Sequence, residues 1–125
     1  LGRQRQRLLV VVDEARGCDV LVHEAFVHDA LLATPGTRSA ATVTAVRTYH
    51  TSPAEAGRAA AEAGVACLVL THIVPPGADP AAIVAEARTT YKGPVIVAED
   101  LTRLDLATRT LAWRGLHMAW DAAGG

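Results

Sequence analysis

The chain has 125 residues, of which 50% are apolar, and its formal net charge is -1. This length suits one domain with a modest core. The near-neutral charge excludes binding to a nucleic-acid backbone through net positive charge alone. No stretch approaches the roughly 20 apolar residues that a membrane-spanning helix needs.

The first predicted elements are a helix and a strand. The segment RLLVVVDEAR is typical of a helix, and Gly17 is expected to end it. The β-branched run CDVLVH, residues 18–23, predicts a buried strand. We expect Cys18 and Cys67 to be buried free thiols because no second cysteine lies at a metal-binding spacing. Free thiols indicate a reducing compartment, the cytoplasm.

The middle of the chain predicts a long loop and then a well-marked helix. Residues 25–48 lack clean periodicity and are interpreted as a loop with helical pieces, and such long loops are often functional. A helix over 53–63 is indicated by Ser52 as the N-cap, with Glu55 three residues later. Gly64 is expected to end this helix.

The second half alternates again between strand and helix. Residues 66–71 predict a strand, HIVPPG a turn, 80–91 a helix and 94–98 a third strand. TRLDL predicts a short fourth strand, and the tail 107–125 gives no clear element. This alternation predicts an α/β fold in which the three main strands share one mostly parallel sheet, with the helices on one face.

Polar side chains lie at the predicted strand ends. Glu24 follows the strand 18–23, His72 follows the strand 66–71, and His50 precedes the capped helix. Ligands bind at the carboxyl edge of parallel strands, so these residues are suited to metal binding or acid–base chemistry. From spacing alone, however, three separate polar residues at strand ends are the favoured interpretation.

Four motifs, in order, resemble one known family. GCDVLVHEAF, YHTSPAEAGRAAAEAGV, LVLTH and GPVIVAEDL are similar to the second half of metallo-β-lactamase-fold hydrolases of the ribonuclease Z and arylsulfatase-like group. The resemblance implies half of an αββα sandwich over residues 1–125, as part of a zinc-dependent hydrolase of ester or phosphodiester bonds that binds two zinc ions.

The resemblance also implies roles for single residues. His72 corresponds to a zinc-ligating histidine, while Glu24 and His50 correspond to a catalytic pair beside the metals. The histidine would lie near the leaving group, and the glutamate would orient it. His23 is expected to be structural, and His28 and His117 match no family position.

The departures from the family set the remaining expectations. The motifs HxHxDH and GDT are absent, so the chain is interpreted as a C-terminal half that is inactive and poorly loaded with zinc alone. The missing half is expected to cover an open, apolar face of the sheet. The segment IVPPGADP after His72 favours a small ester or phosphodiester substrate over tRNA. The alternative function is that of a non-catalytic α/β interaction module. Separately, a homodimer is a possible assembly.

Overall fold

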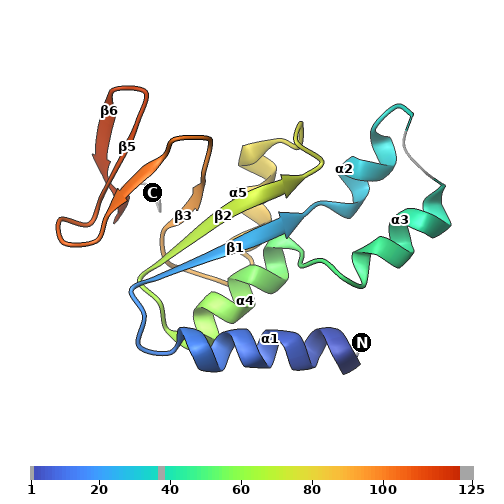
Figure 1. Cartoon of the computed structure of the whole chain (residues 1–125), viewed down its shortest axis with the longest axis horizontal. Coiled ribbons are helices and arrows are strands. Elements are labelled where there is room, and N and C mark those ends of the chain that lie inside the picture. The colour runs from blue at the N-terminus through green and yellow to red at the C-terminus, as the bar shows by residue number, and fades with distance from the viewer. Residues whose placement is uncertain (1, 37–38, 122–125) are drawn as a thin grey trace.

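A computed structural model describes residues 2–36 and 39–121 (Figure 1). Its helices and strands are α1 (Gly2–Ala15), β1 (Val20–Phe26), α2 (His28–Ala33), α3 (Ala40–Arg47), α4 (Pro53–Ala63), β2 (Cys67–Val74), α5 (Pro80–Ala87), β3 (Val95–Val97), β4 (Arg103–Asp105), β5 (Thr110–Trp113) and β6 (Leu116–Ala119). In the described part of the chain, no helix is both long enough and apolar enough to cross a membrane.

The first three strands form one parallel sheet in the order β1-β2-β3, as predicted. Val20 pairs with Cys67 at the start of β1, and Leu68 pairs with Val95 at the start of β3. Side chains alternate between the two faces of this sheet. The sheet therefore has two apolar faces, each of which needs a cover.

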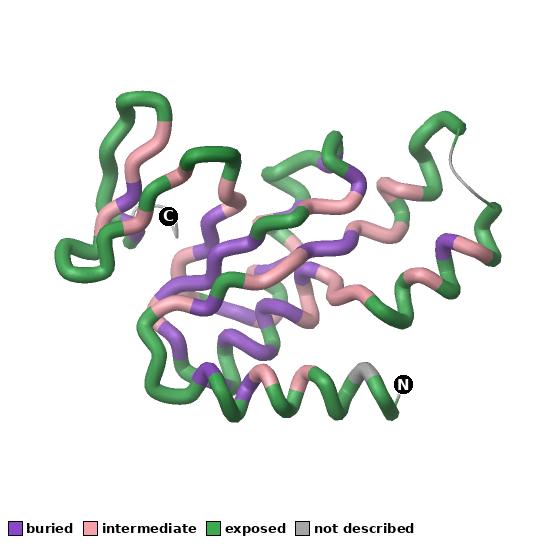
Figure 2. Tube along the Cα trace, in the orientation of Figure 1, coloured by how far each residue is buried: buried purple, intermediate pink, exposed green. Residues whose placement is uncertain are grey.

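Helices α1, α4 and α5 cover one face, which confirms the predicted α/β layer (Figure 1). Leu21, Leu68 and Leu70 of the sheet pack there against alanines of α4 and against Ile83 of α5. The buried part of the chain is concentrated in the sheet and α4, whereas α2 has no buried residue and α3 and the β5–β6 hairpin are mostly exposed (Figure 2).

A second sheet, antiparallel and ordered β4-β5-β6, covers part of the other face. Trp120 and Leu111 pack there against Cys67, Val69 and Ile96. The prediction of a wholly open face is therefore wrong over β2 and β3. Near β1 the face is open, since the apolar side chain of Val22 is 56% exposed.

Several predicted boundaries need correction. Strands β1 and β2 run on to Phe26 and Val74, so HIVPPG does not begin a turn at its first residue. The helix predicted over 80–91 ends at Ala87, because residues 88–90 turn toward the third strand. The predicted loop 25–48 contains the short helices α2 and α3, and its residues 37–38 lie outside the described part.

The tail and one cysteine also differ from expectation. Residues 107–121 carry strands β5 and β6, and residues 122–125 lie outside the described part. The short fourth strand exists as β4, but it belongs to the second sheet. Cys18 is exposed rather than buried, because it lies in the connection between α1 and β1; Cys67 is a buried free thiol as predicted.

Two buried titratable groups lie in different parts of the core, Cys67 under the second sheet and Tyr91 on the helix side. Burial raises the pKa of the Cys67 thiol from 9.0 to about 11, and the negative charge of Asp121 adds to the effect. Burial likewise raises the pKa of the Tyr91 hydroxyl from 10.0 to about 12. This hydroxyl donates a hydrogen bond to the carbonyl oxygen of Val65 at 2.8 Å. Both groups are therefore neutral in the folded protein near pH 7.

Candidate functional site

A β-bulge places one of the predicted site residues. Glu24 of β1 pairs with Thr71 of β2, but the next residue of β1, Ala25, pairs with Ile73. His72 is thus an extra residue in β2, and its φ of 47° is unusual for a residue other than glycine. Sequence analysis placed Glu24 and His72 just beyond their strands; the structure places both within them.

The structure brings Glu24, His50 and His72 together. Oxygen Oε2 of Glu24 lies 2.9 Å from Nδ1 of His50 and 3.6 Å from Nδ1 of His72. The side chains of Glu24 and His50 are about a quarter exposed, at 25% and 28%, whereas His72 is 69% exposed. One carboxylate therefore lies between a half-buried imidazole and one that faces solvent.

Further contacts hold both members of the pair, the imidazole of His50 and the carboxylate of Glu24. Its ring stacks on that of Phe26, with centroids 5.2 Å apart and planes inclined by 16°. The other oxygen of Glu24 accepts a hydrogen bond from the backbone N–H of Thr51 at 3.1 Å. The backbone N–H of Phe26 donates in turn to the carbonyl oxygen of Thr51 at 2.8 Å. The carboxylate and the imidazole are thus fixed relative to each other.

Helix α4 starts directly after this segment, and its N-terminus is firmly capped. Ser52 accepts a hydrogen bond from the backbone N–H of Glu55, and the Glu55 side chain accepts one from the N–H of Ser52, completing the predicted capping box. Glu86 of α5 accepts a third, from the N–H of Ala54, at 2.9 Å. These bonds fix the residue at which α4 begins, and they restrain His50, which stands two residues before the N-cap Ser52.

The other three histidines lie on β1, α2 and β6, and of these His23 lines one cavity together with Glu24 and His50. The ring of His23 contacts the backbone carbonyl oxygen of its neighbour, Glu24, at 3.0 Å. His28 contacts Asp29 and Thr44 at the start of α2. His117 is exposed on β6 of the second sheet. None of the three joins the pair of Glu24 and His50, in line with the sequence analysis.

Two residues that hold the pair in place, Phe26 and Thr51, were not predicted from the sequence. The signal for Phe26 was present in principle, since it stands two residues after Glu24 along an extended strand. It was lost because the strand was expected to end at His23. Thr51 acts through its backbone, which carries no residue-specific signal.

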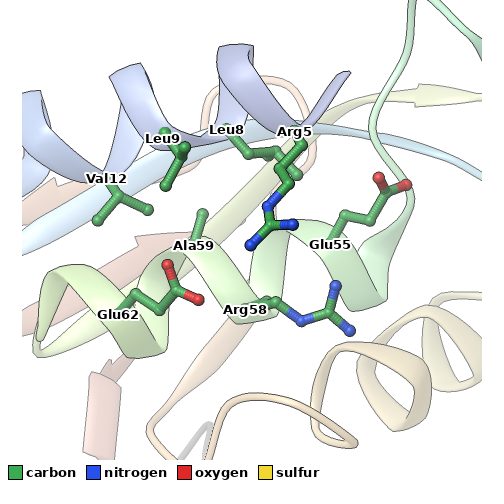
Figure 3. Close-up of a pocket in the computed structure, with 8 residues that line it drawn as sticks. All are labelled: Arg5, Leu8, Leu9, Val12, Glu55, Arg58, Ala59 and Glu62. Atoms are coloured by element: carbon green, nitrogen blue, oxygen red, sulfur yellow. The ribbon is translucent and has the colours of Figure 1, made fainter. Parts of the chain in front are cut away.

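Two cavities adjoin helix α1, and only one contains the pair. A cavity of about 190 Å³ is lined by Arg7, Leu8, Val11, His23, Glu24, Tyr49, His50 and Thr51. A larger one of about 510 Å³ lies between α1 and α4, with Arg5, Arg58, Glu55 and Glu62 around apolar side chains (Figure 3). The larger cavity includes none of Glu24, His50 and His72, whereas the smaller one is lined by Glu24 and His50 but not by His72.

The geometry of the described residues limits how they could bind a metal ion. Within residues 2–36 and 39–121, no group of three or more His, Cys, Asp or Glu side chains is arranged to hold a metal ion. Catalytic zinc sites use three protein ligands. The exposed imidazole of His72 can offer one ligand, so the described residues do not fit a complete zinc site by themselves.

Comparison with known proteins identifies relatives of one kind. No protein-family model matches the chain. A ribonuclease Z of Myxococcus xanthus is 38% identical over 111 residues, covering 87% of this chain and 36% of that protein. A ribonuclease Z of Salinispora arenicola is 32% identical, covering 90% and 36%. A ribonuclease Z of Methanopyrus kandleri is 40% identical over 88 residues, covering 70% and 26%.

A solved structure agrees with these relatives. The metallo-β-lactamase fold protein YhfI from Bacillus subtilis matches with a TM-score of 0.52 and 25% identity, over 72% of this chain and 32% of that one. The chain thus spans 36% of the length of the first two relatives it matches. The fold and family predicted from the four motifs are confirmed. The chain belongs to the ribonuclease Z-like proteins of the metallo-β-lactamase fold.

Proposed function

We propose that the longer protein represented by this chain is a metal-dependent hydrolase of phosphodiester bonds, in which Glu24 and His50 are the acid–base pair. One observation carries the proposal: Oε2 of Glu24 lies 2.9 Å from Nδ1 of His50 at the carboxyl edge of a parallel sheet. The names of the relatives, all ribonuclease Z, support the same reaction class.

The chemistry follows from what each group can donate. A carboxylate only accepts hydrogen bonds, so Nδ1 of His50 carries the proton of the bond to Glu24. Proton exchange with a substrate then takes place at Nε2 of His50. Stacking on Phe26 keeps the ring in one plane while this happens. A general acid placed in this way contributes about 10²–10⁴-fold to the rate.

Zinc is the proposed metal, with His72 as one ligand. Bound zinc would supply a hydroxide from water near neutral pH and polarise the phosphate. His72 fits a ligand role because its imidazole is 69% exposed at the edge of the sheet. Two zinc ions are expected in the longer protein, with the remaining ligands from outside the described residues. The 125-residue chain alone is therefore expected to bind zinc poorly and to be inactive.

RNA is the substrate class that we favour for the longer protein. The relatives' shared name denotes a ribonuclease. The preference for a small ester rests only on the segment IVPPGADP after His72 and gains no support from these relatives. A cytoplasmic location and a homodimer remain predictions. The competing function, a non-catalytic interaction module, is separated by zinc content: about two ions per chain for the enzyme, and none for the module.

The test uses the longer protein that contains this segment. We expect His50→Ala to lower the rate about 10²-fold or more with an RNA phosphodiester, whose alkoxide leaving group needs a proton. The same variant should change little with a nitrophenolate leaving group, at normal zinc content. Glu24→Gln should show the same dependence in weaker form.

His72→Ala should lower zinc content and activity together, and the exposed His117→Ala is the matched control for both. Equal losses on the two substrates with His50→Ala would refute the acid role. Chelator-sensitive hydrolysis of a nitrophenyl phosphodiester by the 125-residue chain alone would refute the expected dependence on outside ligands.

A further inference from the structure

Helix α1 contacts the segment that carries His50. The guanidinium of Arg7 donates two hydrogen bonds to backbone carbonyl oxygens, from Nη2 to Thr48 at 2.5 Å and from Nη1 to Tyr49 at 3.4 Å. These carbonyls stand two residues and one residue before His50. We propose that Arg7 is a positioning residue for His50, an inference that rests on the acid–base function proposed above.

One of the accepting carbonyls, that of Thr48, lies at the end of helix α3. Helix α3 ends at Arg47 with Thr48 as its C-cap, and the last carbonyls of a helix have no partner within it. A cation at a helix C-terminus is also favoured by the helix dipole. The planar guanidinium of Arg7 reaches two carbonyls at once, which a lysine cannot do with the same geometry.

On this side of the segment, the described backbone bonds from Tyr49 to Val46 and from His50 to Arg47 close a tight turn. The Tyr49 side chain is 71% exposed and gives little anchorage. Glu24 and Phe26 hold His50 from the strand, and Arg7, which lines the same 190 Å³ cavity, holds its segment from α1.

Loss of this contact is expected to act on geometry. Displacement of a reacting group by about 1 Å can cost about 10²-fold in rate. Without Arg7, the segment 48–50 can shift from the strand, and the bond between His50 and Glu24 loses its fixed length. The proton on His50 is then no longer restricted to Nδ1, because the carboxylate contact selects that tautomer.

The chain offers a control directly after the same helix. Arg16, one residue beyond the end of α1, donates a hydrogen bond to a distant backbone carbonyl oxygen, that of Glu62 at 3.1 Å. That bond leads to the C-terminal end of α4 and not to the segment that carries His50. Both arginines are exposed, and Arg16 also pairs with Asp13 at 3.6 Å, so its substitution by glutamine likewise removes side-chain contacts to backbone and neighbour.

The experiment measures the tautomer of His50 by ¹⁵N NMR of its imidazole, in this chain itself. We expect the Nδ1-protonated form in the wild type and a mixture of both tautomers in Arg7→Gln. Arg7→Lys should retain most of the Nδ1-protonated form through one remaining bond, and Arg16→Gln should equal the wild type. Far-UV circular dichroism checks that each variant is folded.

Two results would overturn the proposal: an unchanged His50 tautomer in folded Arg7→Gln, or an equal change in Arg16→Gln. In the longer protein, Arg7→Gln should lower kcat with an alkoxide leaving group by up to about 10²-fold at unchanged KM. The NMR result does not depend on hydrolysis, so failure of the proposed function would leave the role of Arg7 separately measurable.

Discussion

The crossing of α4 and α5 leaves no room for a side chain at Gly57. A Cβ atom built there would lie 2.3 Å from Oγ1 of Thr90 and 2.5 Å from the carbonyl oxygen of Ala87. Thr90 could rotate away, but Ala87 contributes backbone, which moves only with the helix. We therefore predict that Gly57→Ala separates α4 from α5 and destabilises the fold.

The size of the effect follows from two opposing terms. Overpacking of this kind costs about 1–3 kcal/mol, and a backbone contact falls at the upper end of that range. Alanine gains about 1 kcal/mol over glycine inside a helix. The net loss is about 2 kcal/mol, which for a domain of this size lowers Tm by about 8 °C.

Thermal and urea unfolding of the chain, followed by circular dichroism, measure this loss. Gly77→Ala is the control, because a Cβ at Gly77 meets nothing within 4 Å. Its stability should change by less than about 0.5 kcal/mol. If Gly57→Ala were as stable as the wild type, the close approach of the two helices would not be a constraint on the fold.

Three further predictions concern stability. Tyr91→Phe should lose about 1–2 kcal/mol in urea unfolding, since the buried carbonyl of Val65 loses its donor; an unchanged midpoint would contradict this. The buried Cys67 thiol should make the free energy of unfolding depend on pH. Its contribution should be complete below about pH 9 and lost as pH rises through about 11, because between these values the unfolded chain releases the thiol proton and the folded chain keeps it. Urea midpoints against pH test this, and a flatter profile in Cys67→Ala is the expected check. Ser52→Ala should cost about 1 kcal/mol through loss of the α4 cap, and equal midpoints would refute that role.

The sequence predicted best where single residues dictate local geometry. The bounds of α4 followed from Ser52 and Gly64, which occupy the N-cap and a left-handed C-cap with φ of 73°. The three parallel strands followed from their apolar runs. Strand order placed Glu24 and His72 at one edge of the sheet, because neighbouring parallel strands end there, but it left open whether they meet His50. The pairing of Glu24 with His50 was expected only from the resemblance to the family.

What the sequence did not predict depends on long-range packing or on rare turn chemistry. The β5–β6 hairpin turns at Arg114 and Gly115, both with positive φ, where asparagine or aspartate usually precedes the glycine. That turn was therefore not recognised, and the second sheet was missed with it. The end of β1 was predicted at His23 because polar residues begin there with His23 and Glu24, but the strand continues to Phe26.

The bulge in β2 changes which residue numbers face the helices. Before it, the even-numbered Leu68 and Leu70 point into the helix-side core; after it, the odd-numbered Ile73 does. Removing His72 outright would restore regular alternation and keep Ile73 on its present face, opposite Ala25. Removing a single residue between Cys67 and Thr71 instead would move the side chains on one side of the deletion to the opposite face of the sheet. His72 is thus a position in β2 whose side chain the core packing does not require. Its identity can therefore be set by what the side chain binds at the edge of the sheet.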